Sequence, residues 1–118
     1  MTPEEHEELK KGIRDAGIDL LINDNKVLKV DGAELNLASI DNTGLGQKFG
    51  RINEAMEGLN HANPTILMAH DPTFWDMQVR GKIPAIDVML SGHTHGGQVG
   101  IHILGEDYSF ARMVYKQW

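Results

Sequence analysis

Two short apolar runs constrain the fold of this chain more than any other feature of its sequence. Residues 65–69 read Thr-Ile-Leu-Met-Ala, and residues 85–90 read Ala-Ile-Asp-Val-Met-Leu. Continuous or nearly continuous apolar runs of this length are typical of strands that are covered on both faces of a sheet. The two runs therefore predict a largely buried sheet with further layers packed against it.

The remaining segments supply the other elements of a layered fold. Thr2-Pro3-Glu4-Glu5 is a helix start with a capping box, and Gly17 is a typical helix stop. The pattern further predicts a strand at 18–22, a hairpin at 26–40, a loop at 41–49, helices at 53–59 and 73–80, and a last strand at 99–104. Asp31-Gly32 is a type I′ turn signal for that hairpin. We therefore expect an α/β fold, an α+β layered sandwich, with residues 1–118 as a single domain.

Composition excludes several classes of protein. The chain has 118 residues, of which 41% are hydrophobic and 24% charged, so it should form a globular core rather than remain disordered. It has no cysteine, which excludes disulfides and cysteine-based zinc sites. A net charge of −6 without a basic cluster argues against binding to a nucleic-acid backbone. No apolar run approaches the roughly 20 residues of a membrane span, so the chain as given should be soluble.

Both apolar runs lead directly into histidine. The first continues as Ala69-His70-Asp71-Pro72, and the second as Ser91-Gly92-His93-Thr94-His95-Gly96-Gly97-Gln98. Because ligands gather at the carboxyl ends of strands in α/β sheets, three imidazoles are expected at one edge, in a transition-metal site. Gly92, Gly96 and Gly97 should let the backbone turn sharply there. Asp71 has two interpretations: a carboxylate that orients a neighbouring imidazole, or a turn-forming residue before Pro72.

These strings resemble two signatures of the calcineurin-like metallophosphoesterase superfamily. Gly92-His93-Thr94-His95 is similar to its last motif and Ala69-His70-Asp71-Pro72 to the preceding histidine motif. The longer string from Leu90 to Gln98 resembles the bacterial YkuE and YaeI phosphodiesterase branch. The family's D-x-H, G-D-x-x-D and G-N-H-D/E motifs have no counterpart here. The resemblance therefore implies the C-terminal half of a four-layer αββα fold, a partial domain without the N-terminal metal motifs and the final strands.

The same resemblance implies a function. It points to a segment of a metal-dependent phosphoesterase, which would hydrolyse a phosphodiester with a metal-bridging hydroxide at a dinuclear site. His70 and His93 would bind one metal and His95 the other, with manganese, zinc or iron as the ions. Two ions are implied for an intact parent and at most one for this chain. No complete catalytic set is present, so the isolated chain should be inactive. The alternative is a non-catalytic metal-binding or assembly domain that retains the scaffold.

The expected partners follow from the missing half. A parent protein would bind a phosphoester substrate and, like relatives in this branch, would be associated with a membrane in bacteria. An uncovered sheet edge with flat apolar strands is a template for pairing with another chain. We therefore expect a homodimer formed by strand exchange, or association with the missing N-terminal half.

Overall fold

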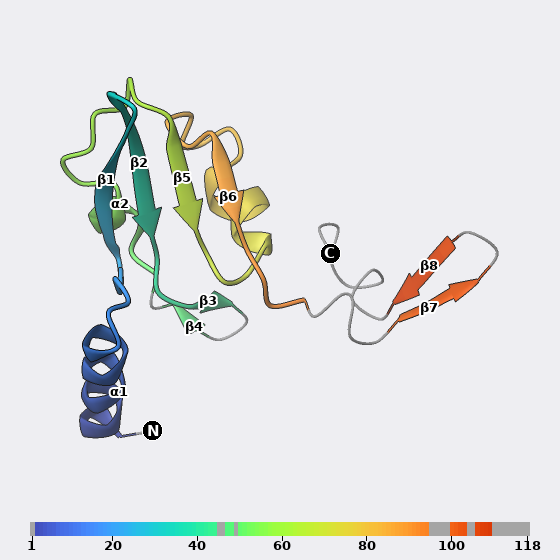
Figure 1. Ribbon diagram of the computed structural model, residues 1–118. Helices are drawn as coiled ribbons and strands as arrows, with labels where there is room; N and C mark the ends of the chain where they lie inside the picture. Colours follow the sequence, from blue (N-terminus) through green and yellow to red (C-terminus); the bar gives the residue numbers. More distant parts are fainter. Residues whose placement is uncertain (1, 45–46, 49, 95–99, 104–105, 110–118) are drawn as a thin grey trace.

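A four-stranded mixed sheet is the centre of the computed structural model, which describes residues 2–44, 47–48, 50–94, 100–103 and 106–109 (Figure 1). The strand order is β1-β2-β5-β6: β1 pairs with β2 antiparallel, and β2, β5 and β6 run parallel. These four strands are β1 (Asp24–Val30), β2 (Ala33–Ser39), β5 (Thr65–Met68) and β6 (Val88–Leu90). The predicted α/β class is confirmed.

The other described elements are helices and two small hairpins. The helices are α1 (Pro3–Asp15), α2 (Ile52–Ala55) and the π-helix η1 (Trp75–Val79). The hairpins are formed by β3 (Thr43–Gly44) with β4 (Gln47–Lys48), and by β7 (Gly100–Ile103) with β8 (Glu106–Ser109). None of the helices in the described part of the chain is long and apolar enough to cross a membrane.

Local signals in the first forty residues are confirmed. The Thr2 side chain accepts a hydrogen bond from the Glu5 amide, and the Glu5 carboxylate accepts one from the Thr2 amide, which completes the capping box of α1. Gly17 follows the helix with a φ of +80°. In the β1–β2 hairpin, Asp31 and Gly32 both have positive φ, as a type I′ turn requires.

Other boundaries differ from the prediction. Residues 18–22 form no strand: Ile18 is 59% exposed and Asp19 pairs with Lys26, so the segment is an external connection. The predicted loop at 41–49 contains the two-residue strands β3 and β4, and β8 was not predicted. Helix α2 and strand β6 are shorter than expected. A segment becomes a strand only where a neighbouring strand hydrogen-bonds its backbone N–H and C=O groups. The sequence of a short segment does not show whether the fold places such a neighbour beside it.

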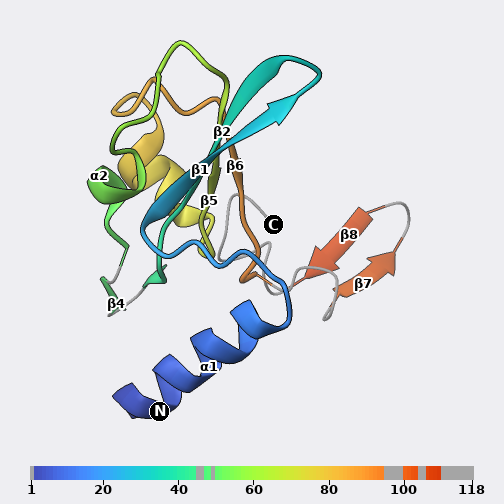
Figure 2. The same cartoon turned by 60° about the vertical axis from the view of Figure 1, so that its left-hand side comes forward.

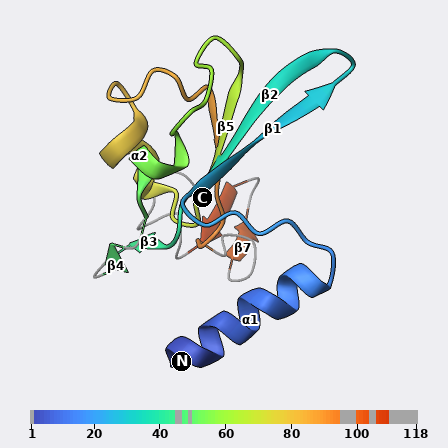
Figure 3. The ribbon, with the colours of Figure 1, turned by 90° about the vertical axis from the view of Figure 1, so that its left-hand side faces the viewer.

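The core lies on one face of the sheet. Figures 2 and 3 show α2 and the helical segment around η1 on the same side of the four strands. Ala38 and Leu67 from the sheet are fully buried there against residues such as Ala55, Phe74 and Val79. The sequence predicted that other elements would cover both faces of the sheet. Among the described residues, helices cover only one face.

Asn23 joins two parts of the fold that are distant in sequence. It is buried, has a φ of +51°, and its Oδ1 accepts hydrogen bonds from the amides of Asp41 (3.0 Å) and Arg51 (2.7 Å). Asparagine tolerates this left-handed conformation better than most residues. The side chain thus holds the segment after β2 to the start of α2.

We expect Asn23→Ala to destabilise the chain by about 1–3 kcal/mol, because two backbone donors lose a shared acceptor. Asn23→Asp keeps an acceptor oxygen and should cost less. Urea unfolding followed by circular dichroism measures both. Equal stability of the alanine variant and the original chain would contradict this role.

Candidate metal centre

Strands β5 and β6 bring His70 and His93 to the same edge of the sheet. Met68 is in register with Leu90, so the two parallel strands end side by side. Backbone hydrogen bonds continue beyond the strand ends, from Ala69 N to the Leu90 carbonyl (3.0 Å) and from Gly92 N to the His70 carbonyl (3.1 Å). The predicted meeting of the two histidine motifs at the carboxyl edge is therefore present in the structure.

The two imidazoles are in direct contact. His93 Nδ1 lies 3.1 Å from His70 Nε2, and the ring centroids are 4.9 Å apart at an interplanar angle of 76°. Two nitrogens bound to one ion at about 2.0–2.1 Å are separated by about 2.9 Å at right angles and about 3.3 Å in a tetrahedral site. The observed separation lies between these two values. A distance of 3.1 Å is also that of a hydrogen bond between the two rings, so it fits both a hydrogen-bonded pair and two ligands of one ion.

The sharp turn in this loop falls on His93. Its φ of +66° is in the left-handed region, which costs a non-glycine residue roughly 1–2 kcal/mol. Gly92 has no positive φ, and a Cβ added there would meet nothing within 4 Å. Strained backbone at residues with reactive side chains is often part of a functional site. The sharp turn that was predicted at Gly92 is therefore made by the backbone of His93.

Asp71 holds the turn that follows His70. Its carboxylate is buried, and Oδ1 accepts hydrogen bonds from Thr73 N (2.8 Å) and Thr73 Oγ1 (2.7 Å). The Phe74 amide donates to the Asp71 carbonyl (3.2 Å), which starts the helical segment. Of the two roles predicted for Asp71, these contacts fit that of a turn-forming residue before Pro72. Asp71 thereby fixes the backbone that carries His70.

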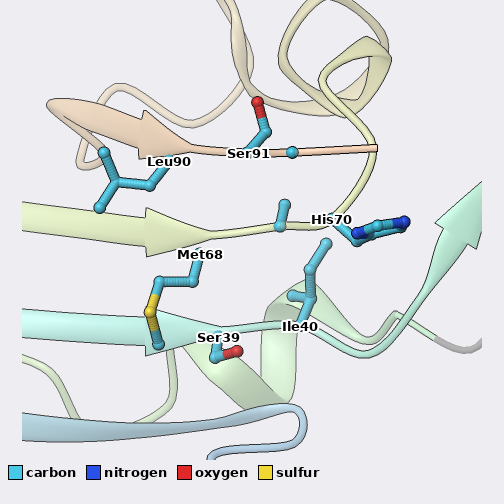
Figure 4. A pocket seen from close by; sticks show the side chains of 8 residues that line it. Ser39, Ile40, Met68, His70, Leu90 and Ser91 are labelled. Carbon is cyan, nitrogen blue, oxygen red and sulfur yellow. The ribbon is translucent and has the colours of Figure 1, made fainter. Parts of the chain in front are cut away.

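A pocket of about 400 Å³ opens beside His70 at the carboxyl ends of β2, β5 and β6. Figure 4 shows the side chains of Met68 and Leu90 along one part of the pocket and His70 at its end. Ser39, Ile40, Ala69, Ser91 and Gly92 complete the lining. The histidine thus borders a depression that is otherwise mainly apolar.

Part of the predicted site lies outside the described residues. His95, Gly96 and Gly97 belong to this part, so the structure does not place the third imidazole or the two glycines. Within the described ranges, no three side chains of the metal-binding types converge. The structure therefore shows two of the three predicted ligands together. The positive φ of His93 had no recognisable signal in the sequence.

The comparisons with known proteins bear on the family. The chain is 30% identical over 98 residues to the phosphodiesterase YaeI of Escherichia coli K12, a match that covers 82% of this chain and 33% of YaeI. It is 39% identical over 70 residues to a bovine transmembrane protein with a metallophosphoesterase domain, covering 59% of this chain and 14% of that protein. The chain is a relative of the metallophosphoesterases. The resemblance to the YaeI branch is thereby confirmed.

The matches to these relatives cover only a small part of each relative. An uncharacterised metallophosphoesterase of Helicobacter pylori 26695 is 42% identical over 50 residues, 41% of this chain and 12% of that protein. This chain spans a third or less of the length of these relatives. No family model and no solved structure matches it. The relatives' names indicate a metal-dependent hydrolase family, whereas membrane association of a parent protein stays a prediction.

Proposed function

We propose that this chain supplies one side of a dinuclear metal centre for phosphodiester hydrolysis. His70 and His93 would hold one divalent ion, manganese, zinc or iron, and His95 would contribute to the second. The observation that carries this proposal is the 3.1 Å contact between His70 Nε2 and His93 Nδ1 at the strand ends. The family relationship supports it, since several relatives are named as metallophosphoesterases or a phosphodiesterase.

The described residues fit an ion at this position. Neutral imidazole is a good ligand for transition metals, and His93 Nδ1 and His70 Nε2 lie 3.1 Å apart. Bound there, a divalent ion supplies Lewis-acid polarisation of a phosphoryl oxygen and lowers the pKa of water. His70 and His93 would bind and orient the ion, and Asp71 positions the backbone that carries His70.

The chain alone should show no phosphodiesterase turnover. Within the described residues no three side chains of the metal-binding types converge, so an ion at the two imidazoles lacks there the carboxylate that would bridge it to a second ion. We expect the hydrolysis of bis(p-nitrophenyl) phosphate with added Mn²⁺ to stay at the rate of Mn²⁺ alone. A rate more than about tenfold above that background would contradict the assignment of an incomplete site.

The proposal also predicts what adjoins the site in a catalytic protein. Reading the coding sequence upstream of Met1 separates the catalytic function from the non-catalytic alternative. D-x-H and G-N-H-D motifs in the same frame would support a phosphoesterase. Their absence from a complete reading frame would favour a metal-binding or assembly domain.

A further inference from the structure

The pocket beside the histidine pair contains a buried hydroxyl group. Ser39 is the last residue of β2, is only 8% exposed and lines this pocket (Figure 4). Its hydroxyl makes no hydrogen bond to any other residue in the part of the chain that the structure describes. Because a buried hydroxyl without a partner costs free energy, a ligand atom that hydrogen-bonds to it is stabilised there.

The side chains beside Ser39 provide apolar contacts. The sheet register places Met68 between Ser39 and Leu90, so the three residues form one row at the ends of β2, β5 and β6. Leu90 is 55% exposed, and the flexible side chain of a methionine adapts to the shape of what it contacts. A volume of about 400 Å³ is in the range of pockets that hold small organic ligands.

The lining also determines which charge the pocket accepts. Apart from His70, none of the described residues that line it has an ionisable side chain. A charged group placed beside Met68 and Leu90 would lose its hydration without gaining a partner of opposite charge. An uncharged apolar group gains free energy when it leaves water. The pocket therefore favours an uncharged, largely apolar group that carries one polar atom for Ser39.

We propose that this pocket binds the uncharged organic group of a phosphoester whose phosphoryl group lies at the histidine pair, with Ser39 Oγ hydrogen-bonded to a hydroxyl or carbonyl oxygen of that group. The inference rests on the proposed function and adds a substrate class to it. His70 links the two places, because its imidazole contacts that of His93 and also lines the pocket. Esters of apolar alcohols are thus favoured over esters whose organic group carries a second phosphate or a carboxylate.

The pocket is tested first without metal. Benzyl alcohol is the probe, because it combines an apolar ring with one hydroxyl. The full chain is labelled with carbon-13 in its methionine methyl groups, and Met68→Leu identifies the NMR signal of Met68. We expect benzyl alcohol to shift this signal in a saturable manner. The carboxylate analogue 4-(hydroxymethyl)benzoate should bind at least about tenfold more weakly.

Two serine variants test the hydrogen bond. Ser39→Ala should weaken the binding of benzyl alcohol about three- to tenfold, the contribution of one hydrogen bond. Ser91→Ala is the matched control and should leave binding unchanged. Ser91 also lines the pocket, but Figure 4 shows its hydroxyl pointing to the opposite side from the Leu90 side chain.

Two further variants test the apolar wall. Leu90→Asn should weaken the binding of benzyl alcohol by about fivefold or more, because the ring loses an apolar neighbour. Val30→Asn is the matched control, since Val30 is also 55% exposed but lies at the other end of the sheet, beside the β1–β2 turn. It should leave binding unchanged.

The link to the histidine pair is tested with two diesters of equal charge. With one equivalent of Zn²⁺ present, dibenzyl phosphate should bind at least about tenfold more tightly than dimethyl phosphate, because only dibenzyl phosphate has a group that fits the pocket. Replacing both His70 and His93 with alanine should weaken the binding of both diesters and leave the binding of benzyl alcohol unchanged.

The outcomes separate this inference from the proposed function. The inference is wrong if benzyl alcohol leaves the Met68 signal unchanged, if Ser39→Ala has no more effect than Ser91→Ala, or if the two diesters bind equally well. If benzyl alcohol binds at Ser39 but zinc strengthens neither diester, the phosphoryl group does not lie at the histidine pair. That result would overturn the proposed function, and with it the assignment of the substrate class.

Discussion

Replacing Leu67 with alanine should destabilise the chain by about 2–5 kcal/mol, the range for a leucine deleted from a packed core. Leu67 is fully buried in the centre of the sheet, where it packs in the core that α2 and η1 cover. The loss combines the transfer free energy of the side chain with that of the cavity left behind. Because total stabilities are commonly only 5–15 kcal/mol, this change should shift the urea midpoint substantially.

Ile66→Ala is the matched control for this effect. Ile66 is the adjacent residue of β5, but its side chain lies on the face of the sheet opposite Leu67 and is only partly buried. Its removal should cost clearly less than that of Leu67, about 1 kcal/mol. Equal losses for the two variants would show that both faces of the sheet are covered in the chain as it folds, and would contradict the one-sided core.

The sequence predicted the parts of the fold that rest on local signals. The capping box at Thr2 and Glu5, the turn at Asp31-Gly32 and the apolar strand at 65–68 are all present. Each follows from hydrogen bonds or backbone preferences within a few residues. The convergence of His70 and His93 was also predictable, because parallel neighbouring strands end at one edge.

The predictions that were wrong depended on contacts between segments that are distant in the sequence. Residues 18–22 are apolar enough for a strand, but none of the described strands pairs with them. The apolar runs at 65–69 and 85–90 indicated cover on both faces, and an alternating pattern of exposure was found instead. A sequence pattern reports which surfaces require burial, but not whether the same chain supplies the cover. The left-handed backbone of His93 likewise depends on the two strand ends that it joins.

Replacing both His70 and His93 with alanine should reduce the affinity of the chain for Zn²⁺ by at least about 100-fold. Even groups that only support a metal ligand typically contribute 10–100-fold to affinity, so loss of two ligands should cost no less. Isothermal titration of the 118-residue chain measures the change. Each single variant should retain weak binding through the remaining imidazole.

His61→Ala is the control for nonspecific binding by surface histidines. His61 is exposed in the turn before β5, and we assign it no part in the site. Its substitution should leave the zinc affinity unchanged within about twofold. Equal losses for His61→Ala and for the double variant would contradict a defined site at the strand ends.

The most direct test of the metal centre is the identity of the nitrogens that bind the ion. Nitrogen-15 NMR of the imidazoles, recorded while Zn²⁺ is added, reports each ring nitrogen separately. The geometry predicts that His70 Nε2 and His93 Nδ1, the two atoms 3.1 Å apart, shift together at one equivalent of zinc. Zinc binding that leaves either of these two nitrogens unchanged would contradict a shared ion between His70 and His93.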